Sequence, residues 1–289
     1  MTCPRYLTSR SGMMHRFRTH DGLTLAFRDE GRGPPLLCLP GLTRNSADFD
    51  YLAPHLSGVR LIRPDYRGRG ESDWADPSTY TVAVESRDVL ALLDHLGVTA
   101  AAVLGTSRGG LIAMVLAATS KHRLLGVCLN DIGPVIDGSG LEKIRGYVGK
   151  NPPQASLHEV ARAQTGLRTG FANVPESRWL EDARRRFVVA EAGLTINYDP
   201  ELARIFDSRS DESATAIPDP WSMFGALEGL PVALVRGVNS DILSAGTAEE
   251  MHRRRPDMIY AEVPDRGHTP FLDEPESLDA IRAWLAKLA

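Results

Sequence analysis

The tightest constraint on this chain is the turn Gly105-Thr106-Ser107-Arg108-Gly109, which joins two segments of different character. The apolar run Ala101–Leu104 before it favours a buried strand, and the segment Leu111–Ala118 after it is rich in helix-forming residues. A G-x-S-x-G sequence in this setting is typical of a nucleophile elbow, a sharp turn that exposes a serine at the end of a sheet. We therefore expect Ser107 to be a nucleophile on a strained turn with positive φ. The pentapeptide alone would also suit a serine that only caps a helix.

Composition and charge are those of a globular protein without a nucleic-acid partner. The chain has 289 residues, of which 43% are hydrophobic and 24% charged, and its net charge is −4. The basic runs at 184–186 and 252–255 lie beside acidic residues, which favours solvated helix faces. No apolar run is long enough to span a membrane, so we expect a cytoplasmic protein.

The cysteines agree with a reducing compartment. Cys3, Cys38 and Cys128 are an odd number without metal-ligand spacing. Cys38 and Cys128 lie inside apolar, strand-like runs and are expected to be buried. Residues 1–12 are expected to form a disordered or loosely docked arm.

Strand-like and helix-like segments alternate along most of the chain. A hairpin is expected over 15–28, with an Asp21-Gly22 turn. Further strands are expected at 36–39, 59–63, 101–104, 124–129, 232–236 and 258–263, and helices at 47–56, 81–96, 111–118, 221–227, 245–255 and 275–288. This order predicts an α/β fold with a mostly parallel, twisted sheet of about eight strands and helices on both faces. Its active site is then expected at the carboxyl ends of the strands.

The alternation stops between residues 134 and 216. This segment is mainly helical in pattern, no strand is expected in it, and aromatic residues such as Trp179 recur through it. The sequence therefore predicts a core formed by residues 1–133 and 217–289 and a helical insert over 134–216, which we call the insert.

A serine nucleophile needs a base, and the base needs an acid that orients it. His268 follows the strand expected at 258–263, and Asp241 follows the strand expected at 232–236. Both then lie at the sheet edge of Ser107, in the chain order Ser, Asp, His. We expect a Ser107–His268–Asp241 triad.

Two other roles for the acidic residues stay open. Asp131 also follows a strand directly and is the rival for the triad acid, whereas Asp265 is less suited because it lies on the loop of His268. Asp241 could alternatively cap the helix that begins near Ser244.

Acyl transfer also needs two donors for the oxyanion of the tetrahedral intermediate. The backbone N–H of Arg108, the residue after the nucleophile, is one expected donor. The backbone N–H of Leu42 is the other, since Gly41 gives this loop the freedom to approach. Whether the Arg108 side chain faces the pocket stays open.

Four motifs carry a resemblance to a known family. They are Leu39-Pro40-Gly41-Leu42, Asp65-Tyr66-Arg67-Gly68-Arg69-Gly70-Glu71-Ser72, the elbow at 105–110, and Gly267-His268 with Asp273-Glu274-Pro275. With them the sequence resembles the α/β-hydrolase fold family, in its proline-iminopeptidase, meta-cleavage-hydrolase and lactonase-like branch. The resemblance implies that the insert is a helical cap over the active site. It also implies that the loop 65–72 is structural and not catalytic.

Departures from the family pattern narrow the chemistry. Haloalkane dehalogenases and epoxide hydrolases place Asp at the elbow, so Ser107 argues against both. Thr269 stands where meta-cleavage hydrolases commonly have tryptophan, which weakens that assignment. The expected function is a serine hydrolase that cleaves a small carboxylic ester or lactone through an acyl-enzyme. A carbon–carbon bond hydrolase of a dienoic acid and a ligand sensor on a hydrolase scaffold are the alternatives.

The remaining expectations concern the ligands. Tyr198, Trp221 and Phe224 are the expected pocket residues. A small-molecule substrate is the expected partner, and no cofactor or metal is expected because nothing has metal-site spacing. The sequence leaves both a monomer and a homodimer open.

Overall fold

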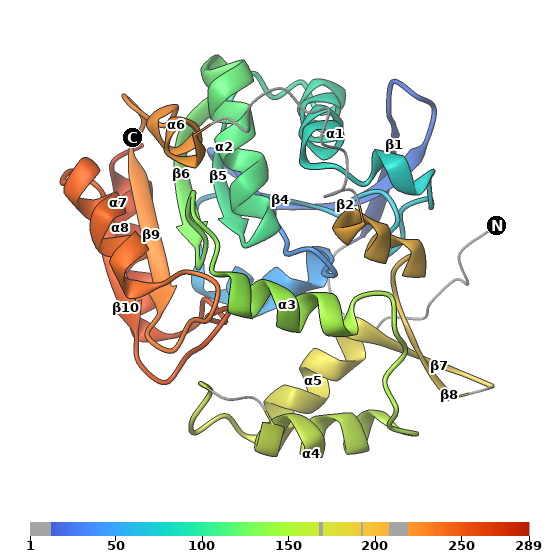
Figure 1. The fold of residues 1–289 in the computed structure, drawn as a ribbon. Coiled ribbons are helices and arrows are strands. Elements are labelled where there is room, and N and C mark those ends of the chain that lie inside the picture. The colour runs from blue at the N-terminus through green and yellow to red at the C-terminus, as the bar shows by residue number, and fades with distance from the viewer. Residues whose placement is uncertain (1–12, 168–169, 192, 208–218, 289) are drawn as a thin grey trace.

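An eight-stranded sheet organises the molecule, with the strand order β1-β2-β4-β3-β5-β6-β9-β10 (Figure 1). The computed structural model describes residues 13–167, 170–191, 193–207 and 219–288, so the expected arm at 1–12 lies outside the described residues. The strands are β1 (Met14–Arg18), β2 (Thr24–Gly31), β3 (Pro35–Leu39), β4 (Arg60–Pro64), β5 (Ala101–Thr106), β6 (Leu124–Asn130), β9 (Val232–Gly237) and β10 (Ile259–Val263). Among the described strands of this sheet, only β1–β2 and β2–β4 pair antiparallel, which confirms the expected mostly parallel sheet.

Successive residues of the central strands pack into two separate cores, because side chains alternate across a sheet. In β5, Val103 joins one core and Leu104 the other. The first core is completed by α1 (Val82–His95), α2 (Arg108–Ser120), α6 (Pro220–Gly225) and α7 (Ala245–Arg254). The second is completed by α8 (Pro275–Ala286) and the 3₁₀ helix η1 (Ser46–Asp50). Cys38 and Cys128 lie in this second core and are fully buried, as expected.

The segment expected as a helix at 47–56 forms two short 3₁₀ helices instead, η1 and η2 (Ala53–His55). Pro54 lacks an N–H and disfavours a continuous α-helix here. The expected N-cap, Ser46, is replaced by Asn45, whose side chain accepts the Ala47 N–H. The Ser46 N–H is already bound to the buried Asp65 carboxylate.

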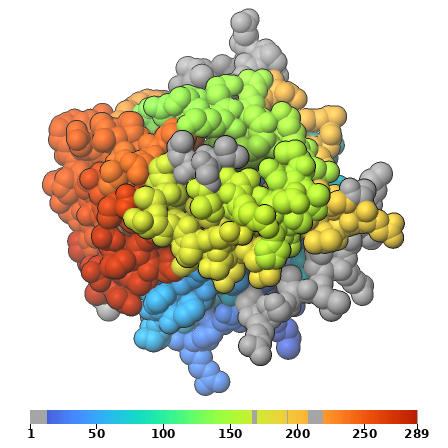
Figure 2. All heavy atoms as spheres, turned by 90° about the horizontal axis from the view of Figure 1, so that it is seen from below, coloured from blue at the N-terminus to red at the C-terminus, as the bar shows by residue number. Residues whose placement is uncertain are grey.

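The described part of the insert contains three α-helices, but the expectation that the insert holds no strand is wrong. Its elements are α3 (Gly138–Tyr147), α4 (Leu157–Leu167), α5 (Glu176–Arg186), the hairpin β7 (Phe187–Ala190) and β8 (Gly193–Ile196), and η5 (Pro200–Phe206). The two strands are four residues each and pair only with one another, so their alternation is too short to stand out in the sequence. Figure 2 shows the insert, green to yellow, across the middle of one face of the molecule.

Within the described ranges, no helix is long and apolar enough to cross a membrane.

The elbow depends on glycine because α2 crosses the sheet edge very closely. A Cβ on Gly109 would lie 2.1 Å from the Leu39 carbonyl oxygen, and a Cβ on Gly105 would lie 2.5 Å from the Gly109 backbone. No side-chain movement relieves a clash with backbone atoms. The strand-to-helix turn therefore tolerates no side chain at either position.

We expect Gly109→Ala to lower the free energy of unfolding by about 3 kcal/mol or more, because the new methyl group forces α2 away from β3. Urea unfolding followed by circular dichroism measures this change.

Gly246→Ala is the matched control, since Gly246 lies in α7 and nothing lies within 4 Å of the position that its new methyl group would take. It should leave stability unchanged or raise it by up to about 1 kcal/mol. Equal effects of the two substitutions would contradict the close-crossing explanation.

Candidate active site

Ser107 lies between β5 and α2 on the strained turn that the sequence predicts. Its backbone has φ 51° and ψ −115°, which confirms the positive φ. Its N–H donates to the Asn130 carbonyl at the end of the neighbouring strand β6. The serine hydroxyl is thereby presented above the carboxyl ends of the parallel strands, at the start of α2.

His268 meets Ser107 as expected. It lies in the loop after β10, and its Nε2 is 2.9 Å from the Ser107 Oγ. Its other ring nitrogen, Nδ1, is 2.7 Å from the Oδ2 of Asp131. A carboxylate accepts but does not donate, so Nδ1 carries the proton and Nε2 keeps its lone pair for the serine hydroxyl.

Asp131 is held rigidly at the end of β6. Its side chain is fully buried, and its backbone has a φ of 55°. The Gly237 N–H donates to Oδ1 at 2.9 Å, and the Ser240 hydroxyl donates to Oδ2 at 2.6 Å. These two donors stabilise the ionised carboxylate and aim it at the imidazole.

The expectation that Asp241 orients the histidine is wrong. The Asp241 carboxylate binds Lys143 of α3 at 2.8 Å, and its side chain is 37% exposed. The loop after β9 turns its successive side chains to opposite sides: Ser240 points to Asp131, whereas Asp241 points to the insert. Asp241 does not cap α7 either, because Ser244 accepts the Thr247 N–H.

The two expected oxyanion donors lie close to Ser107. Leu42 lines the same cavity as the serine, and a Cβ built on Gly41 would lie 3.9 Å from the Ser107 Cβ. Within the described ranges, neither the Leu42 N–H nor the Arg108 N–H donates to another protein group. Both N–H groups are therefore available to a ligand, and their role as oxyanion donors stays a prediction.

The Arg108 side chain turns away from the Ser107 cavity. Its Nε pairs with the buried Glu85 carboxylate at 2.5 Å, and one Nη donates to the Tyr80 carbonyl at 2.8 Å. This guanidinium therefore lines a different hollow of the surface, beside Arg204 and Asp207.

The cavity above Ser107 has a volume of about 110 Å³. The insert contributes Ile144 and Tyr147 from α3 and Asp182 and Arg186 from α5, and the core contributes the loop after β3 and the residues around His268. Tyr147, which is 44% exposed, and Ile144 were not singled out from the sequence. Both lie on the amphipathic α3, which gives no signal of which side faces a substrate.

None of the three expected pocket residues lines this cavity. Tyr198 is buried, and its hydroxyl accepts the Gly149 N–H. Phe224 packs in the core with α2, and Trp221 lies partly buried beside it. The Trp221 ring is covered by the Arg254 guanidinium at 4.1 Å. Each aromatic ring is thus used in packing.

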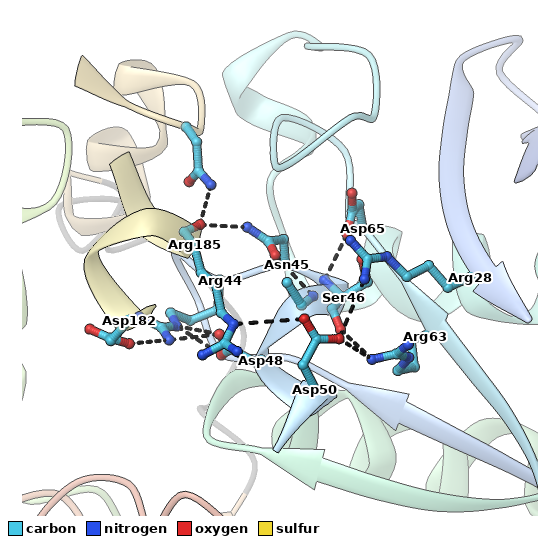
Figure 3. A network of polar contacts seen from close by, with 12 residues as sticks. Arg28, Arg44, Asn45, Ser46, Asp48, Asp50, Arg63, Asp65, Asp182 and Arg185 are labelled. Atoms are coloured by element: carbon cyan, nitrogen blue, oxygen red, sulfur yellow. Dashed lines mark hydrogen bonds and ion pairs between the residues drawn. The ribbon is translucent and has the colours of Figure 1, made fainter. Parts of the chain in front are cut away.

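A cluster of charges joins the loop after β3 to the insert (Figure 3). Arg44 binds Asp48 of η1 and reaches Asp182 of α5 at 2.6 Å. Burial opposes the charge of Arg44, but these carboxylates outweigh it and raise its pKa. Arg44 therefore stays charged and ties the wall of the cavity to α5.

The described residues contain no group of three or more His, Cys, Asp or Glu side chains that could hold a metal ion. The expectation that no metal or cofactor is used stays a prediction.

Sequence comparison agrees with this geometry. A family model described as the alpha/beta hydrolase fold matches residues 34–275. The chain belongs to the α/β-hydrolase fold family. It is 36% identical over 272 residues to the 3-hydroxybutyrate-oligomer hydrolase of Cupriavidus necator. This match covers 92% of this chain and 91% of that protein.

Two further proteins resemble the chain over most of its length. The crystal structure of an alpha/beta hydrolase from Novosphingobium aromaticivorans superimposes with a TM-score of 0.87 at 41% identity, covering 95% of this chain and 98% of that one. The 2-(acetamidomethylene)succinate hydrolase of Mesorhizobium japonicum is 26% identical, over 85% of both chains.

The contacts of the two aspartates predict different effects on Ser107. Asp131→Asn should slow labelling of Ser107 by a fluorophosphonate by about three to four orders of magnitude, because an amide no longer favours the proton on Nδ1. The second-order labelling rate, measured by mass spectrometry, gives the size of this loss.

Asp241→Asn is the control and should label at the wild-type rate, since it removes only a partly exposed ion pair that contributes at most about 1 kcal/mol to stability. Slow labelling of Asp241→Asn beside fast labelling of Asp131→Asn would overturn the assignment.

Proposed function

We propose that this α/β hydrolase is a serine esterase that works through an acyl-enzyme, with Ser107, His268 and Asp131 as its triad. The observation that carries the proposal is the continuous chain of contacts from the Ser107 Oγ through the imidazole to the buried Asp131 carboxylate. A serine hydroxyl alone is a weak nucleophile, and this arrangement is the one that activates it.

In the proposed reaction, the Ser107 Oγ attacks the carbonyl carbon of an ester while His268 Nε2 takes the serine proton. The carbonyl oxygen becomes an oxyanion that the N–H groups of Leu42 and Arg108 stabilise. The intermediate collapses, and the imidazolium gives its proton to the departing alkoxide. Water then attacks the acyl-enzyme with the same histidine as base, which releases the acid and restores Ser107.

A short oligoester of a 3-hydroxy acid is the substrate that we favour. The relative from Cupriavidus necator is named a 3-hydroxybutyrate-oligomer hydrolase and matches this chain almost end to end. Such a substrate is small, carries several ester bonds and has polar ends. The cavity agrees with this chemistry, since apolar Ile144 and Phe271 line it together with Thr43 and the paired charges of Arg44 and Asp182.

A second candidate is the hydrolysis of an unsaturated dicarboxylic acid. The relative from Mesorhizobium japonicum, named a 2-(acetamidomethylene)succinate hydrolase, favours it at lower identity. The same triad would serve, so only the substrate separates the two candidates.

Wild-type protein should hydrolyse the linear dimer and trimer of 3-hydroxybutyrate with many turnovers per Ser107, and Ser107→Ala should lose this activity by a factor of at least about 10³. Release of the monomer, followed by chromatography, measures both.

The same assay is run with the 3-hydroxybutyrate trimer, with this trimer methylated at its free carboxyl group, and with 2-(acetamidomethylene)succinate. Their rates are compared under the same conditions. Turnover of the succinate alone would favour the second candidate. If each protein molecule transfers only one acyl group and retains the product, the protein is a ligand sensor and not an enzyme with turnover.

A further inference from the structure

The loop 65–72, which the family resemblance presents as structural, lies directly behind the loop that bears Leu42. The Tyr66 hydroxyl donates to the Pro40 carbonyl at 3.2 Å, and the Arg69 Nε donates to the Leu42 carbonyl at 3.0 Å. Between them, the Gly41 carbonyl accepts the Arg44 N–H at 3.1 Å. Three consecutive carbonyls of the Leu42 loop are thus each held by a donor.

These three bonds fix the direction of one N–H group. Each peptide unit is planar, so a C=O and the N–H of the next residue point in opposite directions from one rigid plane. The plane that carries the Gly41 carbonyl also carries the Leu42 N–H. With the planes before and after it also held, the Leu42 N–H has little freedom to turn.

Arg69 is joined to the second donor residue through a buried carboxylate. Its Nη1 lies 2.8 Å from Glu85 Oε1, and Glu85 Oε2 lies 2.5 Å from the Arg108 Nε. The Glu85 side chain is fully buried, and that of Arg69 is 1% exposed. The Arg69–Glu85–Arg108 network therefore includes Arg108 and contacts Leu42, the two residues whose N–H groups are the expected oxyanion donors.

The geometry of this network requires the planar guanidinium of Arg69. The Arg69 Nη1 also donates to the Arg67 carbonyl at 2.6 Å, and the guanidinium lies 5.3 Å from the centre of the Tyr80 ring. A lysine ammonium could replace the charge, but a single nitrogen does not reach Leu42, Glu85 and Arg67 at once.

We propose that the buried Arg69–Glu85–Arg108 network positions the two main-chain oxyanion donors, Leu42 N–H and Arg108 N–H. The inference rests on the proposed esterase function, and it makes Arg69 and Glu85 positioning residues, since neither contacts the substrate. A loop that the family pattern presents as scaffold then sets how well the developing oxyanion is bound. The physical reason is preorganisation, because a donor that is already aimed need not move as the charge forms.

Positioning and simple charge predict opposite effects for one substitution. Glu85 carries the negative charge of the network, so Glu85→Gln leaves two arginines without it. If the network acted through its charge, the extra positive potential would strengthen oxyanion binding. If it acts through geometry, the loss of the clamp weakens oxyanion binding.

The same fold offers a matched control. Arg67 also has a side chain that is 1% exposed, and it pairs with Asp88, which lies on α1 about one turn from Glu85. The Arg67–Asp88 pair reaches Asp21 but not Leu42 or Arg108. Arg67→Lys and Asp88→Asn therefore remove a comparable buried pair without touching the donor residues.

The experiment compares wild type with Glu85→Gln and Arg69→Lys, and each of these with its control, Asp88→Asn or Arg67→Lys. Steady-state kinetics with p-nitrophenyl acetate give kcat and KM. Inhibition by an alkyl trifluoromethyl ketone gives Ki. In this inhibitor the Ser107 Oγ adds to the ketone carbon, its proton passes to His268, and the ketone oxygen becomes a bound oxyanion. Thermal unfolding shows which variants are folded.

Glu85→Gln and Arg69→Lys should lower kcat about tenfold and raise the ketone Ki by a similar factor, with KM changed less than about twofold, as expected for weaker binding of the oxyanion alone. Asp88→Asn and Arg67→Lys should keep kcat and Ki within about twofold of wild type, even if their melting temperatures fall equally.

Unchanged or lower Ki in folded Glu85→Gln would overturn the inference, as would equal losses in the two control variants. If Glu85→Gln does not fold, folded Arg69→Lys decides by the same criteria. Wild type that neither labels with a fluorophosphonate nor binds the ketone would overturn the proposed esterase function itself. If wild type reacts with the fluorophosphonate and binds the ketone, and the variants do both equally well, only the positioning role is overturned.

Discussion

The close crossing of α2 over the ends of β3 and β5 is the constraint on which the rest of the site depends. Because glycine stands at 105 and 109, the helix starts within backbone contact of Leu39. This contact places Ser107 beside Gly41 and beside the end of β6, which Asp131 directly follows. The parallel sheet then brings the loop of His268 to the same edge. Residues far apart in the chain meet there because the carboxyl ends of parallel strands lie on one side of the sheet.

Several buried arginines that pair with carboxylates lie around this edge. Arg69 with Glu85, Arg67 with Asp88 and Arg63 with Asp50 all pair arginines that are almost fully buried. Such pairs cost desolvation energy and are weak sources of stability, but they fix geometry because a misplaced partner leaves a charge unpaired. Here each pair is on or beside a loop at the carboxyl ends of the strands. We infer that these buried ion pairs hold the loops in one arrangement.

The sheet and most helices followed from the sequence because their apolar residues repeat with clear periods. The elbow and His268 followed too, since both are tied to strand ends. Asp241 did not, because Asp131 and Asp241 both follow strands, and only the turn of the loop at Ser240 decides which carboxylate faces inward. Aspartate tolerates the positive φ of Asp131 better than most residues, but this does not separate two candidates that are both aspartates. The prediction of the pocket residues failed for a related reason: the sequence does not show whether an aromatic side chain packs inside the protein, as Tyr198 and Phe224 do, or faces a ligand.

The ion pair between Arg44 and Asp182 connects the insert to the loop that bears Leu42, in the wall of the cavity. Asp182 lies on α5 in the wall of the cavity, and the backbone N–H of Arg44 holds the Gly41 carbonyl beside Leu42. A ligand that displaces α5 therefore pulls on the peptide plane whose other end is the Leu42 N–H. A poorly fitting molecule would then bind more weakly and also react more slowly. Discrimination between ligands would therefore extend from affinity to turnover.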